Sequence, residues 1–255
     1  MIYDARELAR VRNPVLLISA AGWILLVVEP GRINMVHCPV ASSGSMLLAM
    51  NPPASLAMGW ALMLVAMMSP VLIQPIRHIR LCSFTHRRTR SIMLFLAGYA
   101  AIWMVLGGVL LAIDSAAKLF SPHSYLPAAG VVIIALVWQF SPIKQRCLNR
   151  CHAHRELAAF GTAADVDALR FGITHGCWCA GSCWALMLVP MLLPGVHIIT
   201  MAAAAVLIFG ERLEQPGLPC WRLRGLGKAI RIAVAQTRIR LRDRRFATPA
   251  ISSGT

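Results

Sequence analysis

The chain has 255 residues, of which 58% are apolar and only 14% are charged, and its formal net charge is +15. A soluble globular domain carries roughly a quarter charged residues, so this composition excludes an ordinary soluble domain and is typical of a membrane protein. The surplus of basic residues favours orientation in a bilayer and contact with anionic lipid over binding to nucleic acid.

Six apolar stretches predict an all-α, polytopic membrane helix bundle with about six transmembrane helices. In chain order they are Pro14–Val28, Ala54–Ile76, Ile92–Ile113, Tyr125–Phe140, Gly172–Leu193 and Pro194–Phe209. The second, third and fifth reach the length of about 20 residues that crosses a hydrocarbon core. The first and the last are shorter, so they must borrow flanking residues or thin the bilayer locally.

The basic residues predict the orientation of this bundle. If the N-terminus lies inside, only Arg32 and Lys118 of the 25 basic residues fall in outer segments. That asymmetry follows the positive-inside rule and places both termini in the cytoplasm. We therefore expect residues 1–215 to form the bundle. Residues 216–255 are expected to form a basic amphipathic tail on the cytoplasmic leaflet, with a disordered end.

The N-terminal stretch has a second interpretation, because Arg6, Arg10 and Arg12 precede an apolar run, as in a cleavable signal peptide. No small-x-small cleavage site follows directly, since Val28 leads into Glu29-Pro30-Gly31. Cleavage would also leave five spans and put the two termini on opposite sides. We favour a retained first helix and leave cleavage as the alternative.

The hexapeptide WALMLV occurs at Trp60–Val65 and again at Trp184–Val189. The similarity continues loosely, with Pro70 aligned to Pro194. With three spans in each half, the two copies would run in opposite directions, which is the arrangement of an inverted repeat. Coincidence in a chain rich in Leu, Ala and Met is the alternative.

The fifth stretch contains four soft-ligand residues at a spacing of four, namely His175, Cys179, Cys183 and Met187. On an α-helix this spacing stacks side chains along one face, with a drift of about 40° per step. Imidazole, thiol and thioether groups so arranged are the ligands of a soft ion such as copper(I). Cys177 should point away from this face.

Further soft ligands are expected nearby, although each also has an ordinary structural interpretation. Met67 and Met68 lie at mid-depth in the second stretch, and Cys147 and Cys151 follow the fourth at a spacing of four. Methionine in an apolar helix is usually a packing residue, and a lone buried cysteine behaves as a small hydrophobe. Hard oxygen ligands are nearly absent from the spans, which argues against Mg²⁺ and Ca²⁺ but leaves Zn²⁺ open.

Three stretches carry a resemblance to a known family, and they are AMMSP at Ala66–Pro70, SPIKQRCLNRC at Ser141–Cys151 and CAGSCWALM at Cys179–Met187. They resemble the bacterial predicted metal-binding integral membrane proteins, a former domain of unknown function. That family includes membrane proteins linked to copper supply for tyrosinases. A closing Glu211-Arg212 resembles the family's acidic-basic pair, whereas Ser182 stands where a second adjacent cysteine is expected, and His197-Ile198 replaces Met-Asn.

The resemblance implies a metal-handling protein of the bacterial cytoplasmic membrane, with copper as the favoured metal. The leading hypothesis is a protein without enzymatic activity that transports copper(I) or delivers it to a copper enzyme, with a soluble metal chaperone as another partner. A structural subunit of a membrane complex is the first alternative. A thiol–disulfide oxidoreductase is the second, but no Cys-x-x-Cys pair occurs and the cysteines face the reducing side.

Overall fold

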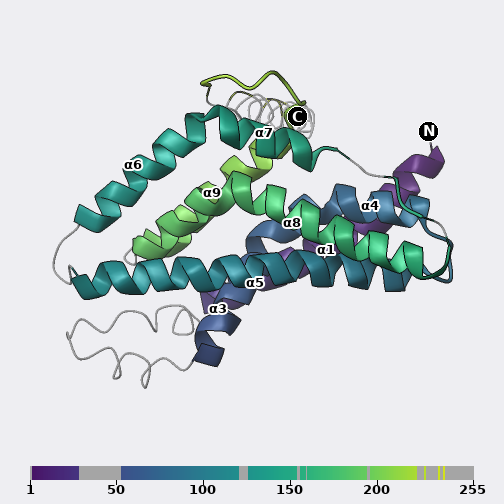
Figure 1. Ribbon diagram of the computed structural model, residues 1–255, viewed down its shortest axis with the longest axis horizontal. Helices are drawn as coiled ribbons and strands as arrows, with labels where there is room; N and C mark the ends of the chain where they lie inside the picture. The colour runs from purple at the N-terminus through teal and green to yellow at the C-terminus, as the bar shows by residue number, and fades with distance from the viewer. Residues whose placement is uncertain are drawn as a thin grey trace, which may run out of the picture.

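The computed structural model describes residues 2–28, 53–120, 126–153, 156–158, 160–193 and 196–222, together with residues 227, 235 and 238. Within these residues all regular structure is helical (Figure 1). The elements are α1 (Ile2–Val28), α3 (Pro53–Met68), η3 (Ser69–Leu72), α4 (Ile73–Cys82), α5 (Arg88–Phe120), α6 (Leu126–Phe140), α7 (Pro142–Cys151), α8 (Gly161–Leu192) and α9 (His197–Arg212). The predicted all-α class is confirmed.

Four helical segments in the described residues are long and apolar enough to cross a membrane. They are Glu7–Val28, Leu56–Cys82, Arg88–Ile113 and Gly161–Leu192. A fifth span results if the bent pair of α6 and α7 counts as one. Helix α9 has only 16 residues, which is short of a full crossing. The predicted apolar helices are therefore present, whereas a count of six spans stays a prediction.

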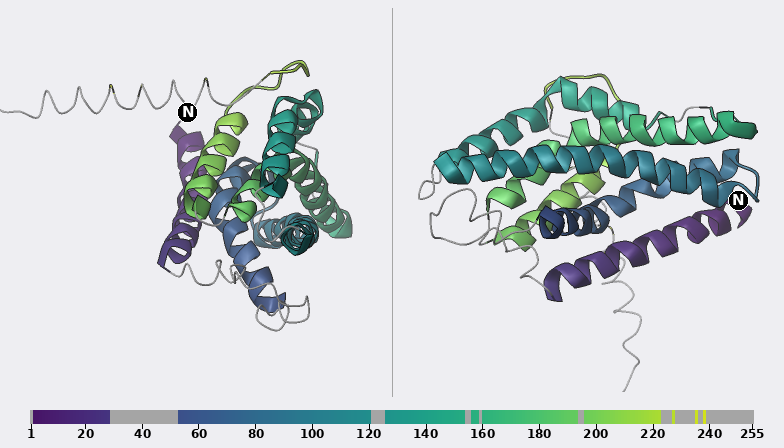
Figure 2. Two further views of the ribbon diagram at one scale, coloured as in Figure 1. Left: turned by 90° about the vertical axis from the view of Figure 1, so that its left-hand side faces the viewer. Right: turned by 60° about the horizontal axis from the view of Figure 1, so that its bottom comes forward.

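Helices α5 and α8 lie side by side along the long axis of the molecule (Figures 1 and 2). Their backbones approach closely at two glycines. A Cβ on Gly172 would lie 2.2 Å from the carbonyl oxygen of Phe95, and a Cβ on Gly98 would lie 2.7 Å from that of Leu169. Small residues at such points let apolar helices pack backbone to backbone. This contact sets the position of α8, the helix with most of the predicted ligands.

Helix α1 packs against α3 and α4 as part of the bundle. The Ser19 hydroxyl donates a hydrogen bond of 2.6 Å to the carbonyl oxygen of Ala66 in α3. At the other end of α1, Glu7 forms an ion pair with Arg80 of α4 at 3.4 Å. These two contacts hold α1 against α3 and α4.

The second predicted span is interrupted by the 3₁₀ turn η3 directly after Met68. Pro70 has no backbone N–H and so cannot continue the α-helical hydrogen bonds, while the Ser69 hydroxyl donates to the carbonyl oxygen of Val65 at 2.6 Å. The second WALMLV copy differs, because α8 runs on through Pro190 to Leu192. Since Pro194 lies outside the described residues, the inverted repeat stays a prediction.

The chain bends by 63° between α6 and α7. Ser141 caps the new helix, since its Oγ accepts a hydrogen bond from the Ile143 amide at 3.0 Å, and Pro142 follows at the first helical position, where proline is favoured. The SPIKQRCLNRC stretch is therefore a separate helix that packs against α8. The sequence had placed this stretch at the inner end of the fourth apolar stretch, which was expected to end at Phe140, where α6 does end.

The segment after α9 lies against α7 and is not helical up to residue 222. Asn149 donates from Nδ2 to the carbonyl oxygen of Gly217 at 2.7 Å, and Gln145 accepts from the Cys220 amide at 3.0 Å. Apart from three single positions, the remaining tail lies outside the described residues, so its amphipathic helix stays a prediction.

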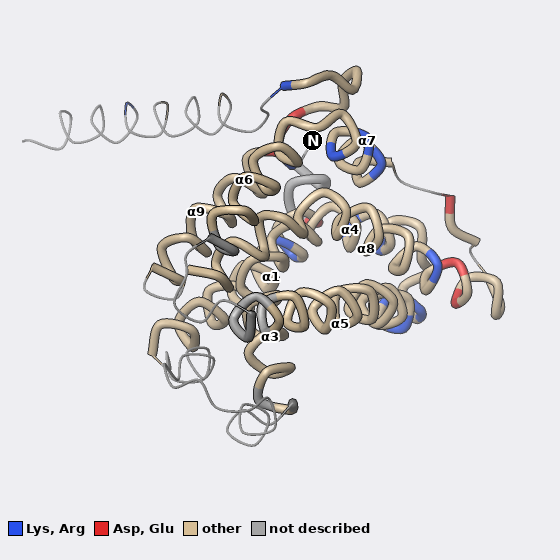
Figure 3. The backbone as a smooth tube through the Cα atoms, turned by 60° about the vertical axis from the view of Figure 1, so that its left-hand side comes forward, with Lys and Arg blue, Asp and Glu red and all other residues tan. Residues whose placement is uncertain are grey.

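The described charged residues are unevenly distributed along the bundle. Figure 3 shows Lys and Arg on α7 and where α4 joins α5, whereas most of the helical path is uncharged. At the second of these places Arg87 and Arg90 both pair with Asp165 of α8, at 2.8 and 2.7 Å. These two arginines hold the start of α8 at this end of the bundle.

Candidate metal centre

The soft-ligand face predicted on α8 points into the protein. His175, Cys179, Cys183 and Met187 are all at most 4% exposed, whereas Trp178 of the same helix is 39% exposed. Cys177, expected to point away, is exposed. The helical period of four therefore identified the buried face of α8 correctly.

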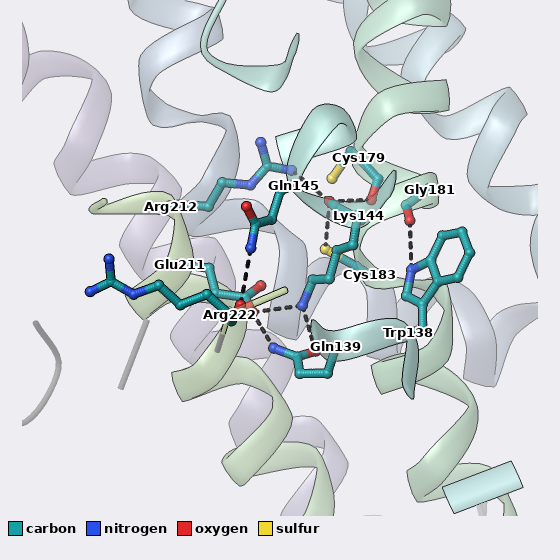
Figure 4. A network of polar contacts seen from close by, with 11 residues as sticks. Trp138, Gln139, Lys144, Gln145, Cys179, Gly181, Cys183, Glu211, Arg212 and Arg222 are labelled. Carbon is teal, nitrogen blue, oxygen red and sulfur yellow. Dashed lines mark hydrogen bonds and ion pairs between the residues drawn. The ribbon is translucent and has the colours of Figure 1, made fainter. Parts of the chain in front are cut away.

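Cys179 and Cys183 form the centre of this face one helical turn apart, and their buried thiols interact electrostatically. The Tyr99 hydroxyl of α5 lies 3.4 Å from the Cys179 sulfur. The Ser182 hydroxyl lies 3.2 Å from the Cys183 sulfur and donates to the carbonyl oxygen of Cys179 at 2.8 Å. Figure 4 shows the two cysteines with Lys144 and Arg212 nearby.

The two cysteines of α7 meet this pair from the side. Cys147 and Cys151 are 8% and 6% exposed, so both thiols are buried between α7 and its neighbours. The Cys147 sulfur lies 3.0 Å from the point that a Cβ on Gly181 would occupy. The lack of a side chain at Gly181 thus makes room for Cys147 against α8.

His175 is buried in an aromatic environment one turn before Cys179. Its ring centroid lies 6.0 Å from Phe95, 6.1 Å from Tyr99 and 5.9 Å from Phe171. These packing contacts account for its burial without an ion. Tyr99 connects the histidine to the sulfur pair, because its ring packs on His175 while its hydroxyl reaches Cys179.

The predicted methionine ligands belong to the same hydrophobic core as the cysteines. Met67 and Met68 are 3% and 1% exposed at the end of α3, and Met187 of α8 is fully buried. Cys151, Cys179 and Cys183 are members of that core too. The structure therefore unites the predicted thioethers and thiols in one interior, where the methionines also have the packing role that apolar helices require.

A charged network that sequence reasoning missed borders the sulfurs. Lys144 of α7 forms an ion pair with Glu211 of α9 at 2.6 Å, with side chains only 3% and 2% exposed, and Gln139 hydrogen-bonds to both. Lys144 had been counted as a loop charge. The sequence did offer one signal, since Lys144 lies only four residues after the apolar stretch that ends at Phe140. An ionisable residue among apolar helices needs a buried partner.

Arg212 follows Glu211 and extends towards the cysteines. Its Nη2 donates to the Ser182 hydroxyl at 3.5 Å (Figure 4), and its guanidinium interacts electrostatically with the thiols of Cys151, Cys179 and Cys183. The family-like stretches on α7, α8 and α9 therefore meet at one corner of the bundle.

The described residues contain no group of three or more His, Cys, Asp or Glu side chains placed to hold a metal ion. What they contain is a pair of cysteines one helical turn apart, with two further thiols nearby. Structural Zn²⁺ sites use four tetrahedral ligands, and no three of the described His, Cys, Asp or Glu side chains are placed to hold one ion, so this arrangement is not a preformed zinc site. A sulfur pair suits copper(I), a soft ion that a pair of thiolates binds in a linear arrangement.

Comparison with known proteins agrees with this chemistry. No curated protein and no solved structure matches the chain. A family model described as PpoB2, copper chaperone, matches residues 57–234, a region that contains all eight predicted ligands. It confirms the resemblance to a copper-supply family that the short stretches carried. The chain belongs to the PpoB2 copper chaperone family.

Proposed function

We propose that the protein is an integral membrane protein that binds copper(I) through cysteine sulfur and hands it to a copper enzyme. The observation that carries this proposal is the meeting of Cys179 and Cys183 with Cys147 and Cys151 in the bundle interior. Membership of a copper chaperone family supplies the metal, and the apolar helices supply the membrane.

The proposed binding site is the Cys179/Cys183 pair, with the α7 cysteines as neighbouring sulfurs that exchange the ion. Each thiol loses its proton to solvent when it binds, and coordination offsets the cost of a buried thiolate. Cys147 and Cys151 lie on the cationic helix α7 and receive the ion at the inner end of the bundle. His175 packs against aromatic side chains of α5 and is not assigned as a direct ligand. Its role is to position Tyr99, whose hydroxyl reaches the Cys179 sulfur.

Release of the ion is assigned to the thioethers of Met67, Met68 and Met187. Thioether sulfur is neutral, so it binds copper(I) more weakly than thiolate does and favours onward transfer. The proposed location is the bacterial cytoplasmic membrane, with both termini inside. The client is a copper enzyme that receives the ion directly or through a soluble chaperone.

A binding titration tests the proposal. Purified protein in detergent is titrated with copper(I) against a chromophoric chelator, alongside the double variant Cys179→Ser/Cys183→Ser. The expected result is a loss of copper(I) affinity of more than about a hundredfold in the double variant. Cys177→Ser is the matched control, because this thiol is on the same helix but exposed, and it should bind as the unmodified protein does.

Two outcomes contradict the proposal. One is a purified protein that binds no copper(I). The other is a double variant that binds it as tightly as the unmodified chain, which would move the site away from α8. Delivery is tested separately, by the rate at which the copper-loaded protein activates a copper-free oxidase relative to copper(I) held by the chelator alone.

A further inference from the structure

We infer that Arg212 is the counter-ion of the sulfur site and makes it selective for a monovalent metal ion. This inference rests on the proposed function and adds a determinant of metal specificity to the same site. Arg212 is a positioning residue, since a cationic guanidinium does not bind the metal itself.

Ser182 links the Arg212 guanidinium to the sulfur of Cys183. The Arg212 Nη2 lies 3.5 Å from the Ser182 Oγ, which lies 3.2 Å from the Cys183 sulfur. Figure 4 shows the guanidinium extended towards Cys179 and Cys183. Its Nε is buried and has no hydrogen-bond partner in the described part of the chain. The guanidinium therefore lies beside the proposed site with hydrogen-bonding capacity to spare.

The carboxylate nearest to Arg212 in sequence, Glu211, is shared with another cation. Glu211 interacts electrostatically with Arg212, but its ion pair is with Lys144 and its hydrogen bond is with Gln139. Among the described residues, no carboxylate forms an ion pair with Arg212. His152 reaches only its carbonyl oxygen, at 3.1 Å from Nε2. One Glu211 carboxylate cannot neutralise both Lys144 and Arg212, and an unbalanced buried cation is costly, so the sulfurs are the groups that can balance the remaining charge.

The charge balance depends on the ion that binds. Two thiolates and one copper(I) ion form an anionic complex, which the positive charge of Arg212 neutralises. Two thiolates and one Zn²⁺ ion form a neutral complex, which leaves Arg212 unbalanced in a medium of low dielectric constant. In both cases two protons leave the thiols for solvent. Arg212 therefore stabilises the copper(I) complex and gives nothing to the zinc complex.

The test compares copper(I) and Zn²⁺ affinities in four proteins, measured by competition with chelators in the same detergent. They are the unmodified chain, Arg212→Gln, Arg212→Lys and the control Arg90→Gln. Arg90 is a surface cation that pairs with Asp165 away from the sulfurs. Arg212→Gln should weaken copper(I) binding by about tenfold or more and leave Zn²⁺ binding unchanged or tighter.

The two remaining variants complete the comparison. Arg212→Lys keeps the charge and should retain most of the preference for copper(I). Arg90→Gln should match the unmodified chain for both ions. If Arg212→Gln does not fold, Arg212→Lys decides the matter, because a preference that is lost although the charge is kept overturns the counter-ion role.

Failure of the inference is distinguishable from failure of the proposed function. If the unmodified chain binds copper(I) and Arg212→Gln lowers both affinities equally, Arg212 only supports the fold and the inference is wrong. An unchanged ratio of the two affinities in Arg212→Gln overturns it as well. If the unmodified chain binds no copper(I), the proposed function fails first, and this inference fails with it.

Discussion

Two regions of the molecule share one hydrophobic core but differ in charge. One is the corner formed by α7, α8 and α9, and the other is the end of α3 at Met67 and Met68. The corner contains the buried Lys144–Glu211 pair and Arg212 beside the thiols. The α3 end contains thioethers among apolar neighbours, next to the 3₁₀ turn η3. Thiolate sites need a compensating charge and thioether sites do not, so the two regions differ as strong and weak copper(I) sites would.

The buried ion pair of the corner should show the largest effect on stability. Lys144→Met leaves Glu211 buried without its cation, and we expect a loss of about 3–5 kcal/mol in the free energy of unfolding. Adding Glu211→Gln removes the stranded charge and keeps a hydrogen-bonding partner for Gln139, so most of the loss should be recovered. Unfolding in mixed detergent micelles measures both variants, and a loss below about 1 kcal/mol in the single variant would contradict the pairing.

The position of the corner relative to the rest of the bundle depends on the close contact of α5 and α8. Gly172→Ala forces a methyl group against the Phe95 carbonyl, and we expect a loss of about 1–3 kcal/mol. Gly108→Ala is the matched control in α5, because nothing lies within 4 Å of its added Cβ. It should be neutral or stabilising by up to about 1 kcal/mol. Equal effects in the two variants would mean that the helices pack differently.

The α3 end should show the smallest effect. Met67→Leu/Met68→Leu keeps apolar volume and should cost less than about 1.5 kcal/mol of stability. Because the cysteine thiolates dominate the affinity, copper(I) binding at equilibrium should weaken by no more than about threefold. Transfer of the ion to a client should become slower. Met58→Leu, an exposed position of α3, serves as the control. A loss of affinity as large as that of the cysteine variant would abolish the distinction between the two regions.

The sequence predicted the features that depend on local periodicity. Hydropathy located the apolar helices, and the spacing of four identified the buried face of α8 from His175 to Met187. Features that depend on contacts distant in sequence were not predicted. The Lys144–Glu211 pair joins residues 67 positions apart, and Cys147 of α7 packs beside Gly181 of α8. The aromatic surroundings of His175 come from α5 and α8 together, so spacing alone could not separate packing from metal binding.

X-ray absorption at the copper edge of the copper-loaded, detergent-purified protein tests the central claim most directly. The account predicts copper(I) with sulfur as its only near neighbours, and loss of that signal in Cys179→Ser/Cys183→Ser. A first shell of nitrogen and oxygen, or a sulfur shell that persists unchanged in the double variant, would contradict it.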